Sequence, residues 1–321
     1  MEINYPNAPI VFIMGPTASG KTALAIDLYQ QASSFHTPFE IISVDSAMVY
    51  RQMDIGSAKP NAKELALAPH HLIDFVDPKE AYSASQFCVD AKKLINDAHQ
   101  NGKIPLLVGG TMLYFKALKD GLAEMPETDQ VIRQQVKDEL EKNGIEHLHR
   151  QLATFDPTTA ERLHYNDSQR ITRAIEVYRM TGKTLAGWHA EQKDRSLRNP
   201  LLSIALAPAE RKILHQRIAL RFNQMMESGF LDEMDKLYHR GDLSLDCPSM
   251  RCVGYRQIWQ YLDGDLSLAE AKERAIIATR QLAKRQYTWL RSWPDAQWFD
   301  PIQSAELEQC KTTIQTFLTQ Q

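Results

Sequence analysis

The chain has 321 residues, which is enough for one large domain or two ordinary ones. With 43% hydrophobic and 24% charged residues it has the composition of a soluble globular protein. Its formal net charge of −3 excludes a uniformly basic nucleic-acid binder but leaves room for local basic patches. The sequence shows no run of 18 apolar residues, no signal peptide and no C-x-x-C pair among its four cysteines. We therefore expect a cytoplasmic protein without structural zinc or disulfides.

The first predicted element is an apolar strand over Pro9–Met14, followed at once by the pattern G-x-x-x-x-G-K-[ST] and then by a helix over Ala23–Tyr29. A strand, this pattern and a helix in succession predict a phosphate-binding loop. The glycines allow the backbone N–H groups to turn inward, and the helix N-terminus adds positive potential. The residues expected to bind a di- or triphosphate are Gly15, Pro16, Thr17, Ala18, Ser19, Gly20, Lys21 and Thr22. Of these, Lys21 reaches the outer phosphates and Thr22 is the expected Mg²⁺ ligand.

Strands and helices alternate over the rest of the first part. We expect strands over Phe39–Val44, Leu72–Val76 (edge-like) and Ile104–Val108, and a helix over Ser83–Ala98. This alternation predicts a parallel sheet with its site at the carboxyl ends of the strands. Asp45 and the Gly109–Thr111 turn follow two of those ends, so we expect them to meet the phosphate loop.

The second part of the chain is mostly helical. We expect helices over residues 129–143, 145–154, 158–164 and 168–180 (with Ser168 as cap), a loop over 188–200, a strand over 201–206, helices over 209–228, 230–239, 253–262 and 268–293, and a short strand over 297–299. The predicted fold is α/β, with a P-loop NTPase-like parallel sheet core, an inserted all-helical domain and a helical C-terminal part. The expected domain ranges are 1–115, 116–200 and 201–321.

Two polar residues at the predicted strand ends are candidates for chemistry. Asp45 can act as a base or hold a metal-bound water, and the alternative is a turn-forming or helix-capping aspartate. Thr111 offers a hydroxyl after two glycines that permit close approach of a ligand. The strand before Gly109 lacks the terminal acid of a phosphate-loop ATPase, which argues against a motor-type enzyme.

Basic residues gather in the helical regions. Arg217 and Arg221 lie one helical turn apart and can clamp a diphosphate opposite Lys21, although a solvated helix face explains them equally well. The segments Gln169–Arg173, Arg251–Arg256 and Thr279–Arg291 are basic, and the last contains aromatic residues and no acid. Basic groups interleaved with aromatic ones suit RNA. The histidine pairs 70–71 and 147–149 lack a second cluster at metal-ligand spacing, so we interpret them as surface or packing residues.

Together these residues resemble the tRNA dimethylallyltransferases, also called tRNA isopentenyltransferases, from Ile10 to about Trp293. The resemblance rests on the phosphate loop and on Ser43–Ala47, Asp54–Pro60, Val108–Tyr114, Gln169–Arg170, Arg173–Ala174, Arg251–Arg256 and Thr279–Gln286. It is to the bacterial form, because we find no Cys and His pairs for the zinc finger of eukaryotic relatives. The resemblance implies transfer of a dimethylallyl group from dimethylallyl diphosphate to N6 of adenosine 37 in the tRNA anticodon arm, with release of diphosphate. The family favours tRNAs that read codons beginning with U.

The resemblance also implies roles for individual residues. Asp45 would take the N6 proton, Thr111 would line the channel that the base enters, and Arg221 and Arg217 would hold the diphosphate. The residues implied in tRNA contact are Asp45, Ser46, Ala47, Met48, Thr111, Arg133, Gln169, Arg170, Ile171, Thr172, Arg173, Arg251, Cys252, Val253, Gly254, Tyr255, Arg256, Lys284, Arg285, Gln286 and Arg291.

The expected partners are the tRNA anticodon stem-loop, dimethylallyl diphosphate and Mg²⁺, with no membrane, and we expect a monomer. Two other functions remain open from sequence. One is a small-molecule kinase of the nucleotide or shikimate type, which the phosphate loop also suits. The other is a non-enzymatic RNA-binding protein that uses a nucleotide as a switch.

Overall fold

The computed structural model describes residues 3–35, 37–122, 129–191 and 196–320. Its internal contacts divide the chain into two compact units. The first combines Met1–Lys119 with Leu197–Gln321, and the second is Asp120–Ser196. Each unit has a hydrophobic core of its own.

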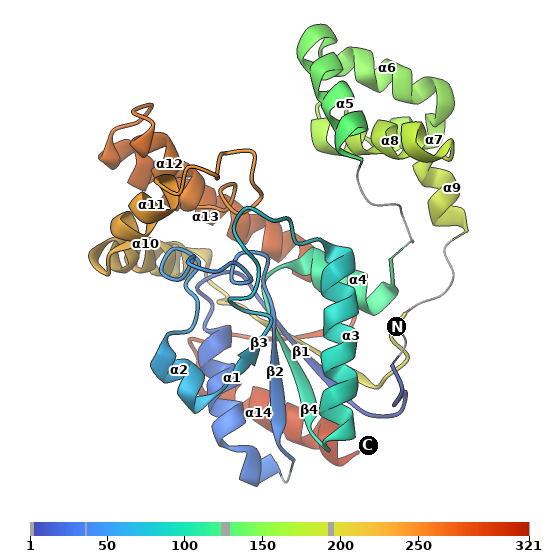
Figure 1. The fold of residues 1–321 in the computed structure, drawn as a ribbon. Coiled ribbons are helices and arrows are strands. Elements are labelled where there is room, and N and C mark those ends of the chain that lie inside the picture. The colour runs from blue at the N-terminus through green and yellow to red at the C-terminus, as the bar shows by residue number, and fades with distance from the viewer. Residues whose placement is uncertain (1–2, 36, 123–128, 192–195, 321) are drawn as a thin grey trace. The chain divides into compact units, whose positions relative to one another are not determined.

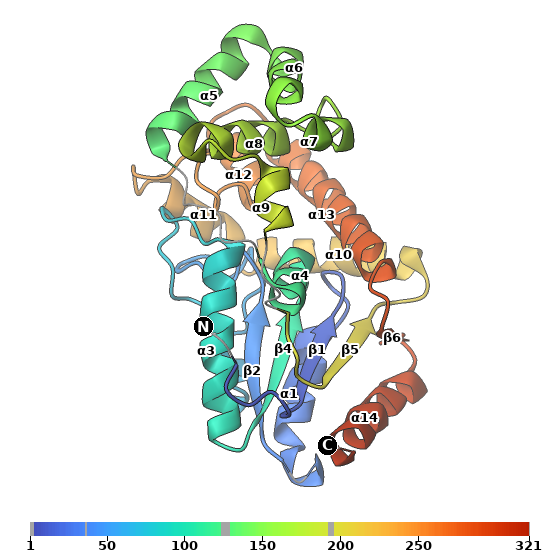
Figure 2. The ribbon, with the colours of Figure 1, turned by 90° about the vertical axis from the view of Figure 1, so that its right-hand side faces the viewer.

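The first unit is built on a parallel sheet (Figures 1 and 2). Its strands are β1 (Ile10–Met14), β2 (Phe39–Val44), β3 (His70–His71), β4 (Ile104–Gly109), β5 (Leu201–Leu206) and β6 (Ala296–Phe299). They lie in the order β3-β2-β4-β1-β5-β6, and every neighbouring pair is parallel. Because parallel strands point the same way, the loops after β1, β2 and β4 leave from one edge of the sheet.

Helices cover both faces of this sheet. The first unit contains α1 (Lys21–Gln30), the 3-10 helix η1 (Ala32–Phe35), α2 (Ala62–Leu67), α3 (Ala84–Gln100), α4 (Met112–Asp120), α10 (Arg211–Glu227), α11 (Phe230–Tyr238), α12 (Tyr255–Leu262), α13 (Leu268–Arg291) and α14 (Ser304–Thr319). Figure 2 shows α3 and α4 on one face and α1 and α14 on the other. Successive β1 residues alternate between the two cores: Val11 and Ile13 face α1 and α14, whereas Ile10 and Phe12 face α3 and α4.

A third core is formed by helices α10, α11, α12 and α13 together with the loop that follows Asp45. Phe222, Phe230 and Tyr255 pack there against Val49 and Met53. The same core therefore anchors the C-terminal helices to the loop after β2, which lies at the edge of the sheet where the strands end.

The regular secondary structure described in the second unit is all helical, with α5 (Gln130–Asn143), α6 (Ile145–Phe155), α7 (Pro157–Arg162), α8 (Ser168–Thr181) and α9 (Leu185–Ala190). Its core includes Val136, Leu148, Leu152 and Ile171, all of which are fully buried. Asp129 caps α5 by accepting hydrogen bonds from the Val131 and Ile132 amides.

The predicted α/β fold is confirmed, and five of the six strands lie where we expected them. The edge strand is wrong: β3 is His70–His71, and Leu72–Val76 is not a strand. Leu72 and Asp74 have φ values of 60° and 58°, which interrupt an extended backbone. The amides of Asp74 and Phe75 instead bind the carbonyls of Met48 and Val49, so this segment braces the loop after β2.

Other differences concern helices. Asp167, not Ser168, caps α8 by accepting from the Arg170 amide. Within the expected loop over 188–200, residues 188–190 belong to α9, and 192–195 lie outside the described residues. Helices α2, α4 and α14 were not predicted from the sequence. The α14 residues Leu307, Cys310 and Ile314 pack onto the sheet, and their helical spacing was a readable signal.

Among the described residues, no helix combines the length and apolar character needed to span a membrane.

The end of β4 requires a residue without a side chain. A Cβ at Gly109 would lie 2.0 Å from the carbonyl oxygen of Val44 on β2. We expect Gly109→Ala to lower the free energy of unfolding by about 3 kcal/mol, because two paired strands must separate. Gly102→Ala is the matched control, since its Cβ would meet nothing within 4 Å and only its φ of +65° is unfavourable. Urea unfolding measures both; an equal or smaller loss for Gly109→Ala would contradict this account.

Candidate active site

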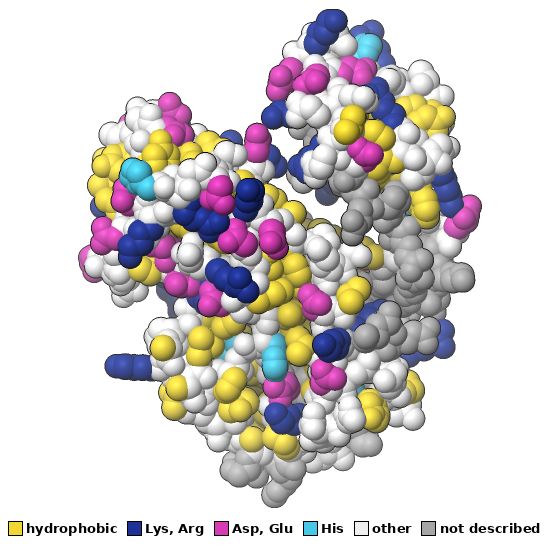
Figure 3. Space-filling view, viewed as in Figure 1, with side chains coloured by type: hydrophobic (Ala, Val, Ile, Leu, Met, Phe, Trp, Pro, Cys, Tyr) yellow, Lys and Arg dark blue, Asp and Glu magenta, His cyan; other side chains and the backbone are white. Residues whose placement is uncertain are grey.

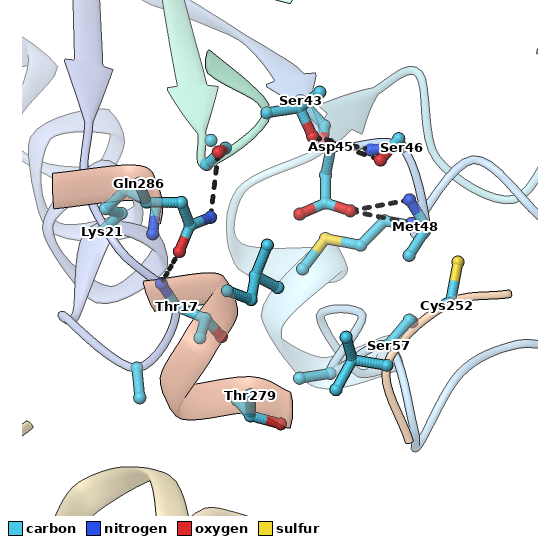
Figure 4. A pocket seen from close by; sticks show the side chains of 18 of the residues that line it. Thr17, Lys21, Ser43, Asp45, Ser46, Met48, Ser57, Cys252, Thr279 and Gln286 are labelled. Carbon is cyan, nitrogen blue, oxygen red and sulfur yellow. Dashed lines mark hydrogen bonds between the residues drawn. The ribbon is translucent and has the colours of Figure 1, made fainter. Parts of the chain in front are cut away.

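A cavity of about 570 Å³ opens at the carboxyl edge of the sheet in the first unit. Its walls come from the loops after β1 and β2, the turn after β4, helices α10 and α13, and the loop that precedes α12. Segments that lie far apart in sequence therefore surround one space (Figure 4). Its volume is within the usual range for small-molecule sites.

The predicted phosphate loop forms one wall. Its backbone is tightly curled: Ala18 and Gly20 have φ values of 61° and 102°, and a Cβ at Gly15 would lie 2.3 Å from the Leu206 carbonyl oxygen. The Ser19 side chain is fully buried, and its hydroxyl has no hydrogen-bond partner among the residues that the structure describes. The N–H groups of this curled backbone, the Ser19 hydroxyl and the N-terminus of α1 together form a site that suits an anion.

Three cationic side chains, those of Lys21, Arg217 and Arg221, lie at or near this loop. The Lys21 ammonium donates to the Pro16 carbonyl oxygen at 2.7 Å. Burial, and next the positive charge of Arg221, lower the pKa of Lys21 from 10.5 to about 7, while Asp45 opposes the shift. Burial also lowers the pKa of Arg221, which lines the cavity from α10. Arg217 lies against the loop, with its Nη2 atom 3.8 Å from the Cβ position of Gly20. An anion bound here would therefore meet positive charge that is shielded from water.

Asp45 lies on the opposite wall. Its Oδ1 atom accepts hydrogen bonds from the amides of Ala47 at 2.8 Å and Met48 at 3.2 Å, so the turn-forming interpretation is part of its role. Figure 4 shows the second carboxyl oxygen pointing into the cavity, toward the side where Lys21 and Gln286 lie. The loop thus fixes the carboxyl group and leaves one oxygen facing the cavity.

Thr111 fixes the same loop from β4. Its hydroxyl accepts from the Ser46 amide at 3.0 Å and lies 3.4 Å from the Ser46 hydroxyl. The Thr111 amide in turn donates to the carbonyl of Val44, just before Asp45. Thr111 therefore both lines the cavity and holds the Asp45 loop in register with the β4 turn.

Gln286 connects the remaining walls. Its Oε1 atom accepts from the Thr17 amide of the phosphate loop, and its Nε2 atom donates to the Gly110 carbonyl, both at 2.9 Å (Figure 4). A Cβ at Gly110 would lie 2.4 Å from Nε2, so glycine is needed for this approach. Sequence reasoning missed this role. One face of α13 lines the cavity, and the spacing of its residues 279, 282, 286 and 289 could be read from the sequence. The hydrogen-bond partners of Gln286 could not.

Glu233 fixes the loop that follows Met53, a second feature without a sequence signal. Its carboxylate accepts from the consecutive amides of Asp54, Ile55 and Gly56 and from the Tyr255 hydroxyl at 2.6 Å. Burial, and next the Glu233 charge, raise the pKa of Tyr255 well above 10, so this hydroxyl stays a donor. The loop then supplies Gly56, Ser57 and Ala58 to the cavity wall.

Cys252 also lines the cavity, but its environment does not suit a nucleophile. Burial, and next the charge of Asp45, raise the pKa of its thiol to about 12. The thiol is therefore neutral near pH 7 and fills space.

The structure brings many of the predicted site residues to this cavity. They are Thr17, Ala18, Lys21, Thr22, Asp45, Ser46, Ala47, Met48, Thr111, Arg221, Arg251, Cys252, Val253, Tyr255, Arg285 and Gln286. The predicted residues of the first unit that do not line it are Gly15, Pro16, Ser19, Gly20, Arg217, Gly254, Arg256, Lys284 and Arg291.

The other predicted residues belong to the second unit. Arg133, Gln169 and Arg170 are exposed, Thr172 and Arg173 are half-buried, and Ile171 is fully buried in the core of that unit. Arg170 pairs with Asp167 at 3.3 Å and Arg173 with Glu176 at 3.5 Å, both along α8.

The residues present fit a magnesium ion only in part. Within the described part of the chain, no three His, Cys, Asp or Glu residues gather at metal-ligand positions. His149 contacts the carbonyls of Ala160 and Leu163, which fits its interpretation as a packing residue. The Thr22 hydroxyl lines the cavity near the phosphate loop. Mg²⁺ commonly takes few protein ligands and completes its shell with phosphate oxygens and water, which is compatible with this donor set.

A phosphate loop on an α/β sheet, without an acid at the end of β4, is typical of a phosphate-loop transferase rather than an ATP-driven motor. Comparison with known proteins identifies the type of transferase. The family model described as IPP transferase matches residues 48–293, and the model described as isopentenyl transferase matches residues 8–74.

Solved structures agree with this assignment. A tRNA isopentenylpyrophosphate transferase from Bacillus halodurans is 36% identical over 98% of this chain and 98% of that one, with a TM-score of 0.71. A tRNA delta(2)-isopentenylpyrophosphate transferase from Staphylococcus epidermidis is 33% identical over 97% and 99%, with a TM-score of 0.66. A eukaryotic dimethylallyltransferase acting on tRNA is 28% identical over 96% and 78%, with a TM-score of 0.80.

The chain belongs to the IPP transferase family, and it is a tRNA prenyltransferase. The family resemblance read from the sequence is thereby confirmed.

The lowered pKa of Lys21 predicts a pH dependence of stability. Without added ligand, the folded state binds fewer protons than the unfolded state between pH 7 and 10.5, so the wild-type free energy of unfolding rises with pH across this window. Lys21→Met removes this rise, which amounts to at most about 1.4 kcal/mol per pH unit. We therefore expect the variant to gain most stability over wild type at pH 7 and below, and progressively less toward pH 10.5.

Urea unfolding at several pH values measures this difference. Lys284→Met, at an exposed position on α13, is the control and should follow the wild-type pH profile. Parallel profiles for wild type and Lys21→Met would show that the buried amine is not the cause.

Proposed function

We propose that this enzyme transfers the dimethylallyl group of dimethylallyl diphosphate to N6 of adenosine 37, in tRNAs that read codons beginning with U. The observation that carries the proposal is the single cavity with a phosphate loop on one wall and the free oxygen of Asp45 on the other. A donor that must lose diphosphate and an acceptor that must lose a proton need these two features on opposite sides.

The donor half follows from the cations. When the allylic C–O bond breaks, positive charge develops on carbon and negative charge on the leaving diphosphate. Lys21, Arg221 and the loop N–H groups stabilise that negative charge from a partly desolvated wall of the cavity. A Mg²⁺ ion at the Thr22 hydroxyl would supply further charge neutralisation for the diphosphate oxygens.

The acceptor half follows from Asp45. An exocyclic amine conjugated to a purine is a weak nucleophile, so orientation and proton removal both assist it. The free Asp45 oxygen accepts a hydrogen bond from the amine and takes its proton as the new N–C bond forms. The proton thus ends on Asp45 and the electron pair of the C–O bond leaves with the diphosphate. Thr111 holds the loop that carries Asp45, which keeps the carboxyl group in place.

An adenine in a folded anticodon loop must leave the base stack to enter such a cavity. Ser46 and Met48 beside Asp45, with Arg251 and Trp289 on other walls, supply polar, cationic and aromatic groups for the extruded base and its neighbours. We propose that Arg285 and the exposed Lys284 and Arg291 of α13 contact the RNA backbone. We propose the same role for Arg133, Gln169 and Arg170 of the second unit.

The charge on the face shown in Figure 3 is compatible with selective RNA binding there. In Figure 3, Lys and Arg side chains over the α10–α12 region are interspersed with acidic ones. RNA recognition would then rest on particular contacts rather than on one broad basic field.

The described cysteines are all free thiols, and we propose that the enzyme works in the cytoplasm, as a monomer.

Direct transfer tests the proposal. Purified enzyme, dimethylallyl diphosphate, Mg²⁺ and an unmodified tRNA transcript should yield N6-dimethylallyl adenosine at position 37, detected by nucleoside mass spectrometry. The same transcript with guanosine at 37 is the control and should stay unmodified. Consumption of ATP with a small acceptor, or tight tRNA binding with no change in nucleoside mass, would contradict the proposal.

Asp45→Asn tests the proposed base. Asparagine keeps an oxygen to accept from Ala47 and Met48 but cannot take a proton, so the loop should hold its shape. We expect kcat to fall by about 10²- to 10⁴-fold with tRNA affinity nearly unchanged. Asp27→Asn on α1 is the control and should retain full turnover. An equal loss of tRNA affinity and turnover would instead indicate an RNA contact.

A further inference from the structure

Gln286 is a buried polar residue whose neighbours differ from those expected of an RNA contact. Its side chain belongs to the interior, with a residue exposure of 8%, whereas Lys284 and Arg285 of the same turn are exposed. Both ends of its amide are used by protein backbone. Oε1 accepts from Thr17 and Nε2 donates to Gly110. These two bonds fix the orientation of the amide between two backbone segments, which is a structural contact rather than an exposed RNA-binding one.

The two partners of Gln286 belong to the two halves of the proposed reaction. Thr17 is in the phosphate loop, and Gly110 precedes Thr111, whose hydroxyl holds the Ser46 amide next to Asp45. Three hydrogen bonds, joined by the backbone between Gly110 and Thr111, thus connect the phosphate loop through one amide on α13 to the Ser46 amide, which is next to Asp45 in the chain. Each link is 2.9 to 3.0 Å long.

Only a residue of this length and chemistry fits the position. Gln286 must accept from an N–H group and donate to a carbonyl at once, which an amide does and an ionised carboxylate does not. The absence of a side chain at Gly110 allows the amide to approach, since a Cβ there would lie 2.4 Å from Nε2. The contact spans 269 residues of sequence to Thr17, so nothing local sets this distance.

We propose that Gln286 is a positioning residue that sets the separation between the phosphate loop and the Thr111–Asp45 side of the cavity. This inference rests on the proposed function. The allylic carbon and the attacking amine must meet at a defined distance, and a misplacement of about 1 Å can cost 10²-fold in rate. Gln286 acts through the loops that it joins and contacts neither reacting group.

Gln286→Met tests this role, because methionine keeps the length and removes both hydrogen bonds. We expect the single-turnover rate at saturating substrates to fall at least 10-fold, while the KM for tRNA stays within about twofold of wild type. Gln286→Asn, whose arm is one methylene shorter and reaches one partner at most, should give an intermediate loss; it also keeps the test valid if Gln286→Met folds poorly. Gln281→Met is the matched control, at an exposed position on the same helix.

A single-turnover rate within twofold of wild type, with only the melting temperature lowered, would show a purely structural role and overturn the inference. A tenfold rise in the KM for tRNA with an unchanged rate would show an RNA contact and also overturn it.

Hydrogen–deuterium exchange gives a readout that does not depend on tRNA transfer. The phosphate-loop peptide of Gln286→Met should exchange faster than that of wild type, and its affinity for inorganic diphosphate should fall. If wild-type enzyme fails to modify tRNA, the proposed function is wrong, but these two measurements still decide the inference. Unchanged exchange and unchanged diphosphate affinity would overturn it.

Discussion

The partly desolvated ammonium group of Lys21 is the feature on which the rest of the site depends. It lies near a second half-buried cation, Arg221, and partial desolvation together with the Arg221 charge lowers its pKa to about 7. Holding two partly desolvated positive charges together is unfavourable for folding, and a diphosphate bound between them would reverse that effect. Stability is thus given up at the place where negative charge must develop during prenyl transfer, which is the usual form of electrostatic preorganisation.

The sheet supplies the rigid frame for that charge. Three strand ends converge because parallel strands share an edge, and glycines at positions 15, 109 and 110 let backbone segments approach more closely than a side chain would allow. Helix α13 then closes the arrangement through Gln286, and Glu233 fixes the loop after Met53. The cavity is therefore built by contacts between distant segments, with few local ones.

The dependence of the cavity on contacts between distant segments explains which of its features could be predicted from the sequence. The strands and the phosphate loop depend on short-range patterns, so β1, β2, β4 and the Gly15–Thr22 loop were readable from apolar runs and one motif. Asp45 and Thr111 could be placed because they follow strand ends. The left-handed backbone at Leu72 and Asp74 has no such signal in an apolar run, and the predicted edge strand was wrong for that reason. The backbone partners of Gln286 and Glu233 could not be found, because each of these contacts joins segments more than 170 residues apart.

In the proposed reaction, donor and acceptor meet in one cavity from opposite walls. A crystal structure of the enzyme with an unreactive analogue of dimethylallyl diphosphate and an anticodon stem-loop RNA tests it most directly. We predict the diphosphate at Lys21 and Arg221, and the adenine N6 within about 3 Å of the free Asp45 oxygen. An adenine bound outside the cavity, or an Asp45 carboxyl group turned away from it, would contradict the account.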